Sequence, residues 1–176
     1  MECASQMVRL VVLFFAVLLS YLAASADLQA QTAEEFMSRG LTHFKNAYYK
    51  ATPGKSKARI DREYDLAEKA FKNAIQRRPD WLEAYLSLGR NYFVQKKYPQ
   101  AAETYRAALK LDPQEKAVYL NLASAQEMSG DYAGAVDTLR RLRAQESDER
   151  TLRILDEFIQ KLEKKAQSQA FTQEAR

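Results

Sequence analysis

The sequence repeats with a fixed period. Tyrosine, alanine, a bulky apolar or aromatic residue, and proline each recur 34 residues apart, at Tyr64, Tyr98 and Tyr132, at Ala67, Ala101 and Ala135, at Phe71, Tyr105 and Leu139, and at Pro79 and Pro113. A period of roughly 20–50 residues is typical of proteins built from stacked structural repeats. We therefore expect an array whose function lies in a surface rather than in a single active site.

The most regular copy of the repeat spans residues 82–113. Its apolar and small residues fall at helical spacing on two successive segments, with Tyr85, Leu88, Gly89 and Tyr92 on the first and Ala101, Tyr105 and Ala108 on the second. The small residues allow two helices to approach closely, and Pro113 ends the second helix because it lacks a backbone donor. This copy resembles the tetratricopeptide repeat, whose pattern is a large residue, Leu-Gly, Tyr, Ala, an aromatic residue, Ala and Pro.

The resemblance implies an all-α fold, a right-handed superhelical array of three helix pairs followed by a capping helix. The expected units are repeats at 32–80, 81–113 and 114–147, a capping helix at 148–165, a linker at 27–31 and a flexible tail at 166–176. Asp131 is expected to cap the second helix of the third repeat, and Asp148 or Thr151 the capping helix. The capping helix would cover the apolar end of the third repeat.

The first repeat contains an insertion. Gly40 precedes its counterpart Gly89 by 49 residues, which is 15 more than the period of 34. The inserted stretch is basic and contains the turn signal Thr52-Pro53-Gly54. The sequence therefore predicts two lengthened helices joined by a turn near Pro53.

The N-terminal segment 1–26 has the features of a secretory signal peptide. Arg9 precedes an apolar run that starts at Leu10, and Ala24-Ser25-Ala26 forms a cleavage site with small residues. We expect an exported protein, periplasmic or extracellular, that begins at Asp27 after cleavage. The alternative is an uncleaved membrane anchor through residues 10–26.

The composition argues against several function classes. The net charge of +4 is spread along the helices rather than gathered in one stripe, so nucleic-acid binding is not expected. The single cysteine, Cys3, lies within the expected leader, and the single histidine, His43, is expected to be structural. No phosphate-binding loop, metal-ligand cluster or nucleophile motif is present, so we expect no enzyme activity, no cofactor and no metal.

The resemblance implies that the first helices of successive repeats line a groove that binds a protein or peptide partner. The corresponding residues are Met37, Leu41, Phe44, Lys45, Glu83, Leu86, Ser87, Arg90, Phe93, Val94, Leu120, Asn121, Ser124, Glu127 and Met128. The alternative role for Leu86, Leu120 and Met128 is packing against neighbouring helices. Chaperone adaptors of this family hold a terminal carboxylate with Lys and Asn residues, but only Asn121 fits that pattern here, so such a clamp is not expected.

Two hypotheses for the interface follow. In the first, Arg90 binds an acidic residue of the partner beside a hydrophobic anchor. In the second, the basic insert is the interface, through Tyr48, Tyr49, Lys55, Lys57 and Arg59. Either way the sequence predicts an exported, non-catalytic protein–protein interaction adaptor. The alternative is a fixed structural component of a cell-envelope assembly or secretion complex.

Overall fold

Every regular element that the computed structural model describes is an α-helix. The described residues are 2–49 and 56–174, with side chains throughout 31–49 and 56–172 and at scattered positions before residue 31. The helices are α1 (Glu2–Tyr49), α2 (Lys57–Arg77), α3 (Leu82–Val94), α4 (Tyr98–Leu111), α5 (Lys116–Ser129), α6 (Tyr132–Arg143) and α7 (Glu149–Glu174).

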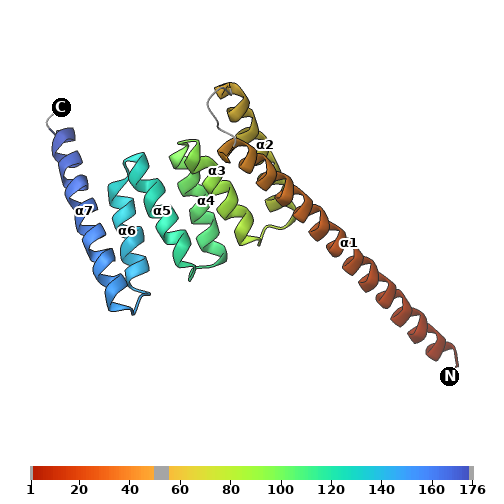
Figure 1. The fold of residues 1–176 in the computed structure, drawn as a ribbon. Coiled ribbons are helices and arrows are strands. Elements are labelled where there is room, and N and C mark those ends of the chain that lie inside the picture. Colours follow the sequence, from red (N-terminus) through yellow and green to blue (C-terminus); the bar gives the residue numbers. More distant parts are fainter. Residues whose placement is uncertain (1, 50–55, 175–176) are drawn as a thin grey trace.

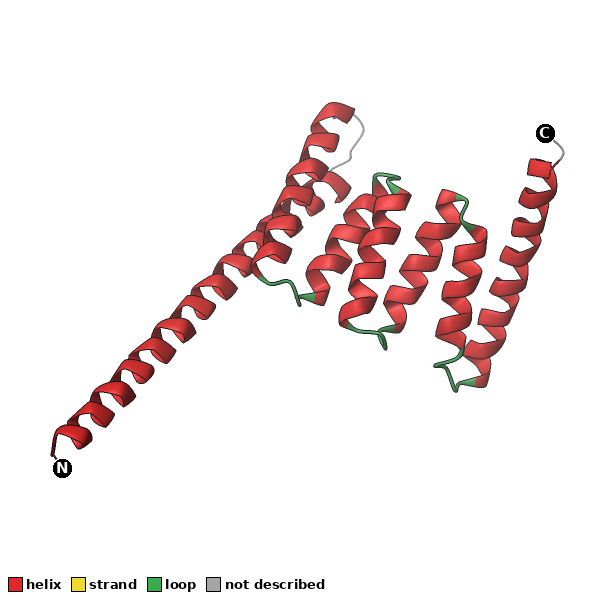
Figure 2. Ribbon diagram, turned by 180° about the vertical axis from the view of Figure 1, so that it is seen from behind, coloured by secondary structure: helices red, strands yellow, loops and turns green. Residues whose placement is uncertain are grey.

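The helices form a linear array in which each one packs against the next along the chain. Figure 1 shows α1 at one end of the array and α7 at the other, and Figure 2 shows the short connections from behind. The pairs α1–α2, α3–α4 and α5–α6 correspond to the three repeats, and α7 packs against α6. The expected all-α array of three helix pairs and a final helix is confirmed.

In the first two pairs, the helices meet where a glycine faces an aromatic ring. A Cβ built on Gly89 would lie 2.5 Å from the ring of Tyr105, and one built on Gly40 would lie 2.5 Å from the ring of Phe71. Only glycine leaves room for the ring at this distance. The alanines at the repeated position, such as Ala101, are fully buried beside this contact.

The glycine contact also defines the insertion. Phe71 follows Gly40 by 31 residues, whereas Tyr105 follows Gly89 by 16, a difference of 15. The two pairs therefore have the same kind of packing contact. The additional residues lengthen the C-terminal end of α1 and the N-terminal end of α2. The turn expected at Thr52-Pro53-Gly54 lies outside the described residues.

The polar groups of the third repeat are satisfied locally. Gly130, at φ 82°, ends α5, and Asp131 caps α6 by accepting a hydrogen bond from the Gly134 amide at 3.0 Å. Gln126, which occupies the position of Tyr92 in the second repeat, is buried. Its Oε1 accepts a hydrogen bond from Thr138 Oγ1 at 2.7 Å, and its Nε2 donates to Asp131 Oδ2 at 3.2 Å.

The final helix covers the end of the array and is longer than expected. Leu155, Ile159 and Leu162 are buried in the common core, and Asp148 accepts a hydrogen bond from the Thr151 amide at 2.8 Å. The helix continues to Glu174, so the segment expected as a flexible tail is helical through residue 174. Residues 27–31, expected as a linker, lie inside α1. Neither segment contains glycine or proline, so nothing in them stops a helix.

The N-terminal part of α1 extends away from the array (Figure 1). The aromatic side chains of Phe14 and Phe15 on this part are exposed. Most side chains of the expected leader, 1–26, lie outside those described. Within the described part of the chain, no helix is long and apolar enough to cross a membrane.

We predict that Gly89→Ala destabilises the protein. In an open helix this change stabilises by about 0.5–1 kcal/mol, because alanine has the higher helix propensity. Here the new methyl group would overlap the Tyr105 ring, and overpacking of this kind costs about 1–3 kcal/mol. Urea unfolding followed by circular dichroism measures the difference. Ser87→Ala, on the same helix, is the control and should not destabilise the protein. Equal stability of the two variants would contradict the packing of Gly89 against Tyr105.

A second prediction concerns α7. Leu162 is fully buried against the third repeat, so Leu162→Ala should lower the free energy of unfolding by about 2–5 kcal/mol. Deletion of 148–176 should expose the same surface and cause partial unfolding or aggregation. Ile154, which is 58% exposed on α7, provides the control Ile154→Ala. A truncated protein that stays soluble with unchanged thermal melting would show that α7 does not cap the array.

Candidate functional site

A cavity of about 390 Å³ lies where α1, α3 and α5 face one another. Its lining residues are Phe44, Tyr48 and Tyr49 from α1, Arg90, Phe93 and Val94 from α3, Tyr105 from α4, and Asn121 and Ser124 from α5. Six of these belong to the groove predicted from the sequence, and two belong to the predicted second surface. The two candidate surfaces therefore meet in a single cavity.

Arg90 is the charged residue of the cavity. It is exposed, and no described residue forms a hydrogen bond or an ion pair with it. Two glutamates on neighbouring stretches of helix, Glu83 and Glu127, could in principle form a salt bridge with Arg90, but neither does. Glu127 instead accepts a hydrogen bond from Lys165 Nζ of α7 at 2.7 Å. Because the described residues that line the cavity include no carboxylate, the guanidinium is available for a negatively charged ligand.

Three further polar groups line the cavity. Among the described residues, no hydrogen bond is formed by the side chains of Asn121, Ser124 or Tyr105. Burial raises the pKa of Tyr105 to about 12, against the opposing effect of the Arg90 charge, so the phenol stays protonated at neutral pH. The cavity thus offers neutral donors and acceptors beside one cation.

Aromatic rings form the other part of the cavity. Phe44 and Tyr48 stack with ring centroids 5.6 Å apart at 12°, and Tyr48 and Tyr49 meet edge to face at 5.0 Å and 83°. Phe93 is held by an edge-to-face contact with Tyr98 at 5.4 Å. Apolar rings and a free cation therefore lie within one site.

The structure places Met37 in the core rather than in the groove. Met37 is 8% exposed and belongs to the main hydrophobic cluster. It lies three residues before Gly40, so both residues occupy the helix face that packs against α2. The prediction that Met37 lines the groove is wrong for this reason.

The remaining predicted groove residues lie outside the cavity. Leu86 is half-buried and packs against the core, which is the alternative role given above for Leu86, Leu120 and Met128. Leu120 and Met128 are exposed. The other residues of this group are exposed or half-buried on α1, α3 and α5: Leu41, Lys45, Glu83, Ser87 and Glu127.

Two cations of the predicted second surface, Lys57 and Arg59, are exposed at the start of α2 and do not line the cavity. Lys55 lies outside the described residues. Among the described residues of that surface, the tyrosines Tyr48 and Tyr49 contribute to the cavity.

Two features of the site were missed by sequence reasoning. Tyr105 was assigned to the core, yet it also lines the cavity. The signal in the sequence was its hydroxyl group, because phenylalanine fills the equivalent core position in the first pair, at Phe71. His43 was expected to be structural, and sequence spacing indicated no partner for it; its Nδ1 lies 2.8 Å from Glu63 Oε2 on α2. The hydrogen bond with His43 lowers the pKa of Glu63. No sequence spacing indicates this pair, because the insertion separates the two helices.

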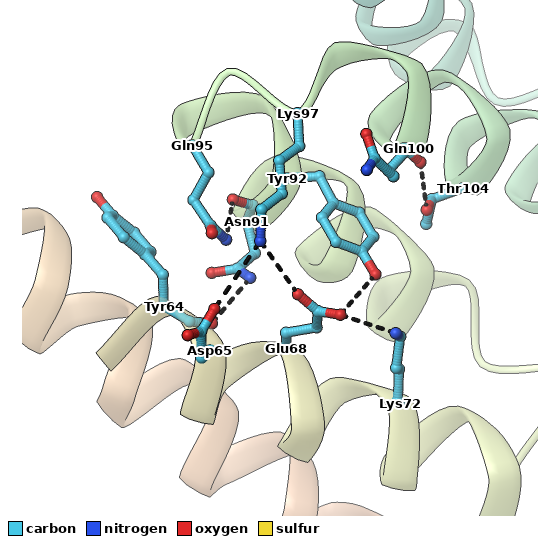
Figure 3. Close-up of polar contacts among 10 residues, drawn as sticks. All are labelled: Tyr64, Asp65, Glu68, Lys72, Asn91, Tyr92, Gln95, Lys97, Gln100 and Thr104. Carbon is cyan, nitrogen blue, oxygen red and sulfur yellow. Dashed lines mark hydrogen bonds and ion pairs between the residues drawn. The ribbon is translucent and has the colours of Figure 1, made fainter. Parts of the chain in front are cut away.

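The face of α3 opposite the cavity is anchored to α2 (Figure 3). The Tyr92 hydroxyl donates to Glu68 Oε1 at 3.0 Å, and Lys72 Nζ donates to the same oxygen at 2.7 Å. Lys97 adds ion pairs to Glu68 at 3.6 Å and to Asp65 at 3.8 Å. Asn91 Nδ2 donates to the Tyr64 carbonyl at 3.1 Å. These contacts hold α3 in place and so orient Arg90 and Phe93 toward the cavity.

Glu68 is the acceptor at the centre of this network. Burial acts to raise its pKa, but the hydrogen bonds from Lys72 and Tyr92 and the positive charges outweigh burial, so the pKa of Glu68 lies below its usual value. Burial also raises the pKa of Tyr92, so its hydroxyl stays a donor at neutral pH.

Comparison with known families agrees with the fold. The family model of the tetratricopeptide repeat matches residues 61–116 and 86–149, which together cover half of the chain. The chain belongs to the tetratricopeptide repeat family. Its three TPR units are α1–α2, α3–α4 and α5–α6, and the glycine–aromatic contacts of the first two are the family's Gly and aromatic positions. A comparison with curated protein sequences finds no match.

Solved TPR structures share this fold at low sequence identity. The yeast Sti1 TPR2B domain in complex with pHsp70 is 24% identical, with a TM-score of 0.55 over 79% of this chain and 98% of that one. The yeast Sti1 TPR2AB domain in complex with pHSP90 is 23% identical, with a TM-score of 0.57 over 84% of this chain and 52% of that one. The Arabidopsis OM64 TPR domain is 18% identical, with a TM-score of 0.55 over 76% and 98%.

We predict that Glu68→Gln lowers stability at neutral pH and not in acid. Because the folded protein lowers the pKa of Glu68 from its usual value of 4.5, the contribution of Glu68 to stability is complete above pH 4.5. It is lost as the pH falls through the lowered pKa. At pH 7 the variant should lose about 1 kcal/mol, and the difference from the wild type should vanish in acid. Urea unfolding between pH 3 and pH 7 measures this. The control is Glu103→Gln, an exposed residue on α4 without a described partner; a pH dependence equal to that of Glu68→Gln would contradict the role of the network.

Proposed function

We propose that this protein is an exported, non-catalytic adaptor that binds a peptide segment of a partner protein in the groove centred on the Arg90 cavity. One observation carries the proposal. An unpaired guanidinium lies beside exposed aromatic rings in a cavity whose described lining residues include no carboxylate. This combination suits a partner segment that has an acidic residue next to a hydrophobic anchor.

The family supports the protein-binding class. TPR arrays are protein-interaction modules, and the two Sti1 structures with this fold are complexes with pHsp70 and pHSP90. At identities below 25% these structures supply the fold alone, so the binding residues of this chain have to be argued from its own cavity. Asn121 is the sole residue at the chaperone-clamp positions that fits, so a different anchor, Arg90, takes the acidic group.

The family and the sequence support the non-catalytic and exported parts of the proposal. The TPR is a protein-interaction module. The N-terminal segment 1–26 has the charge, apolar run and small-residue site of a leader. Export would place the groove in the periplasm or outside the cell.

The alternative, a fixed component of an envelope assembly or secretion complex, is favoured by α1. Its projecting part carries exposed apolar side chains, among them Phe14, Phe15 and Leu19, that a permanent neighbour could cover. Pull-down from envelope extract separates the two functions. A single stable, stoichiometric complex favours the structural component, whereas several weak clients that compete with one another favour the adaptor.

We predict that Arg90→Ala weakens partner binding about tenfold or more without unfolding the protein, because a hydrogen bond to a charged group contributes about 1.5–3 kcal/mol. Binding should also become less sensitive to salt, since a screened ion pair is lost. The measurement is the apparent affinity for clients in the pull-down at two salt concentrations.

The control for this variant is Arg153→Ala. Arg153 is exposed on α7, at the other end of the array, and the change removes the same charge. It should leave binding unchanged. Binding that survives Arg90→Ala but is lost on neutralising Lys55, Lys57 and Arg59 would place the interface on the basic insert instead.

A further inference from the structure

The first helix pair has an added turn beside the cavity. In the second pair, α3 ends at Val94, five residues after Gly89; in the first pair, α1 continues nine residues past Gly40, to Tyr49. The last four residues of α1 thus have no counterpart in α3. Two of these four residues are Tyr48 and Tyr49, which line the cavity.

The part of α1 that carries the added turn packs against α2. Ala47 is fully buried, and His43 Nδ1 lies 2.8 Å from Glu63 Oε2 across the helix pair. The Phe44 ring, stacked on Tyr48, also meets the ring of Tyr64 at 6.1 Å and 62°. The tyrosines at the end of the turn are therefore presented by a packed helix rather than by a loose loop.

Although their backbone is fixed, the two rings are left open to solvent. Tyr48 is 51% exposed and Tyr49 is 73% exposed. Exposed rings that line a cavity are a common feature of binding sites, because they supply a large apolar contact area with little loss of conformational entropy. Arg90 reaches the same cavity from α3.

We propose that the added turn of α1 forms a side-chain subsite, which takes an aromatic or large aliphatic residue of the bound peptide while an adjacent acidic residue binds Arg90. This inference rests on the proposed function and names the peptide class that the site selects. The added turn thereby gives the groove a specificity that an array with a first helix as short as α3 would lack.

Charge and size favour this occupant. Among the described residues that line the cavity there is one unpaired cation and no carboxylate, and this charge complements a single acidic group. Its volume of about 390 Å³ is at the lower end of ligand pockets, a size suited to a side chain and its neighbour. The unpartnered groups of Asn121 and Ser124 can hydrogen-bond the peptide backbone.

The test begins with selection of binders. The immobilised full chain is exposed to a displayed library of random 12-residue peptides. The expected result is enrichment of peptides that carry Phe, Tyr, Trp or Leu next to Asp or Glu. Enriched peptides with an acidic residue but no apolar preference would overturn the inference and leave the proposed function standing. If no peptide is enriched, both the inference and the peptide-binding function fail.

A double-mutant cycle then locates the contact. Affinity for the best peptide, measured by fluorescence anisotropy, should fall about fivefold to tenfold with Tyr48→Ala, and Tyr49→Ala should weaken it in the same direction. The same peptide with its aromatic residue replaced by alanine should bind both variants as well as it binds the wild type. Equal weakening for the two peptides would overturn the subsite.

Two controls keep the cycle decisive. Phe171→Ala removes a ring that is 76% exposed on α7, far from the cavity, and should not change affinity. Thermal melting by circular dichroism shows whether Tyr48→Ala disturbs the helix pair through the lost stacking on Phe44. If it does, Tyr49→Ala decides the result, because Tyr49 is the more exposed of the two rings.

Discussion

The rest of the structure depends on the contact between a glycine and an aromatic ring inside a helix pair. Gly89 lies against Tyr105, and Gly40 lies against Phe71, at distances that leave no room for a side chain on the glycine. The contact fixes how the two helices are rotated. Successive residues of a helix point about 100° apart. The contact at Gly89 therefore also determines the direction of Arg90, the next residue, which points away from the pair. Tyr105 belongs both to the interface between α3 and α4 and to the cavity, because its ring packs on Gly89 and also lines the cavity.

The 15 additional residues of the first repeat leave this contact unchanged. They lie between the glycine and its aromatic partner, so the pair keeps its packing and grows only at its open end. Growth at that end brings Tyr48 and Tyr49 to the cavity shared with α3 and α5. Two residues of the lengthened helix, Tyr48 and Tyr49, therefore lie in the same cavity as six residues of the predicted groove.

Ion pairing explains why Arg90 differs from neighbouring cations. Lys72 and Lys97 are engaged by Glu68, and Lys165 is engaged by Glu127. The Lys97 pair joins the first two repeats, and the Lys165 pair joins the third repeat to α7. Lys72 and Glu68 lie one turn apart on α2. Arg90 lies on the opposite face of α3 from Tyr92, so the network that anchors α3 cannot reach it (Figure 3 shows the anchored face). Its charge is left for a ligand.

The sequence by itself determined the repeat, the pairing of helices and the length of the insertion. Each rests on residues a few helical turns apart, such as Leu88, Gly89 and Tyr92, whose spacing decides which face is buried. Only the tertiary structure decided which surface residues share a cavity, that Met37 is buried and that His43 meets Glu63. These outcomes depend on how far α1 and α2 continue and on which neighbouring helix each face meets. Spacing within one helix contains no information about contacts between helices that are distant in the chain.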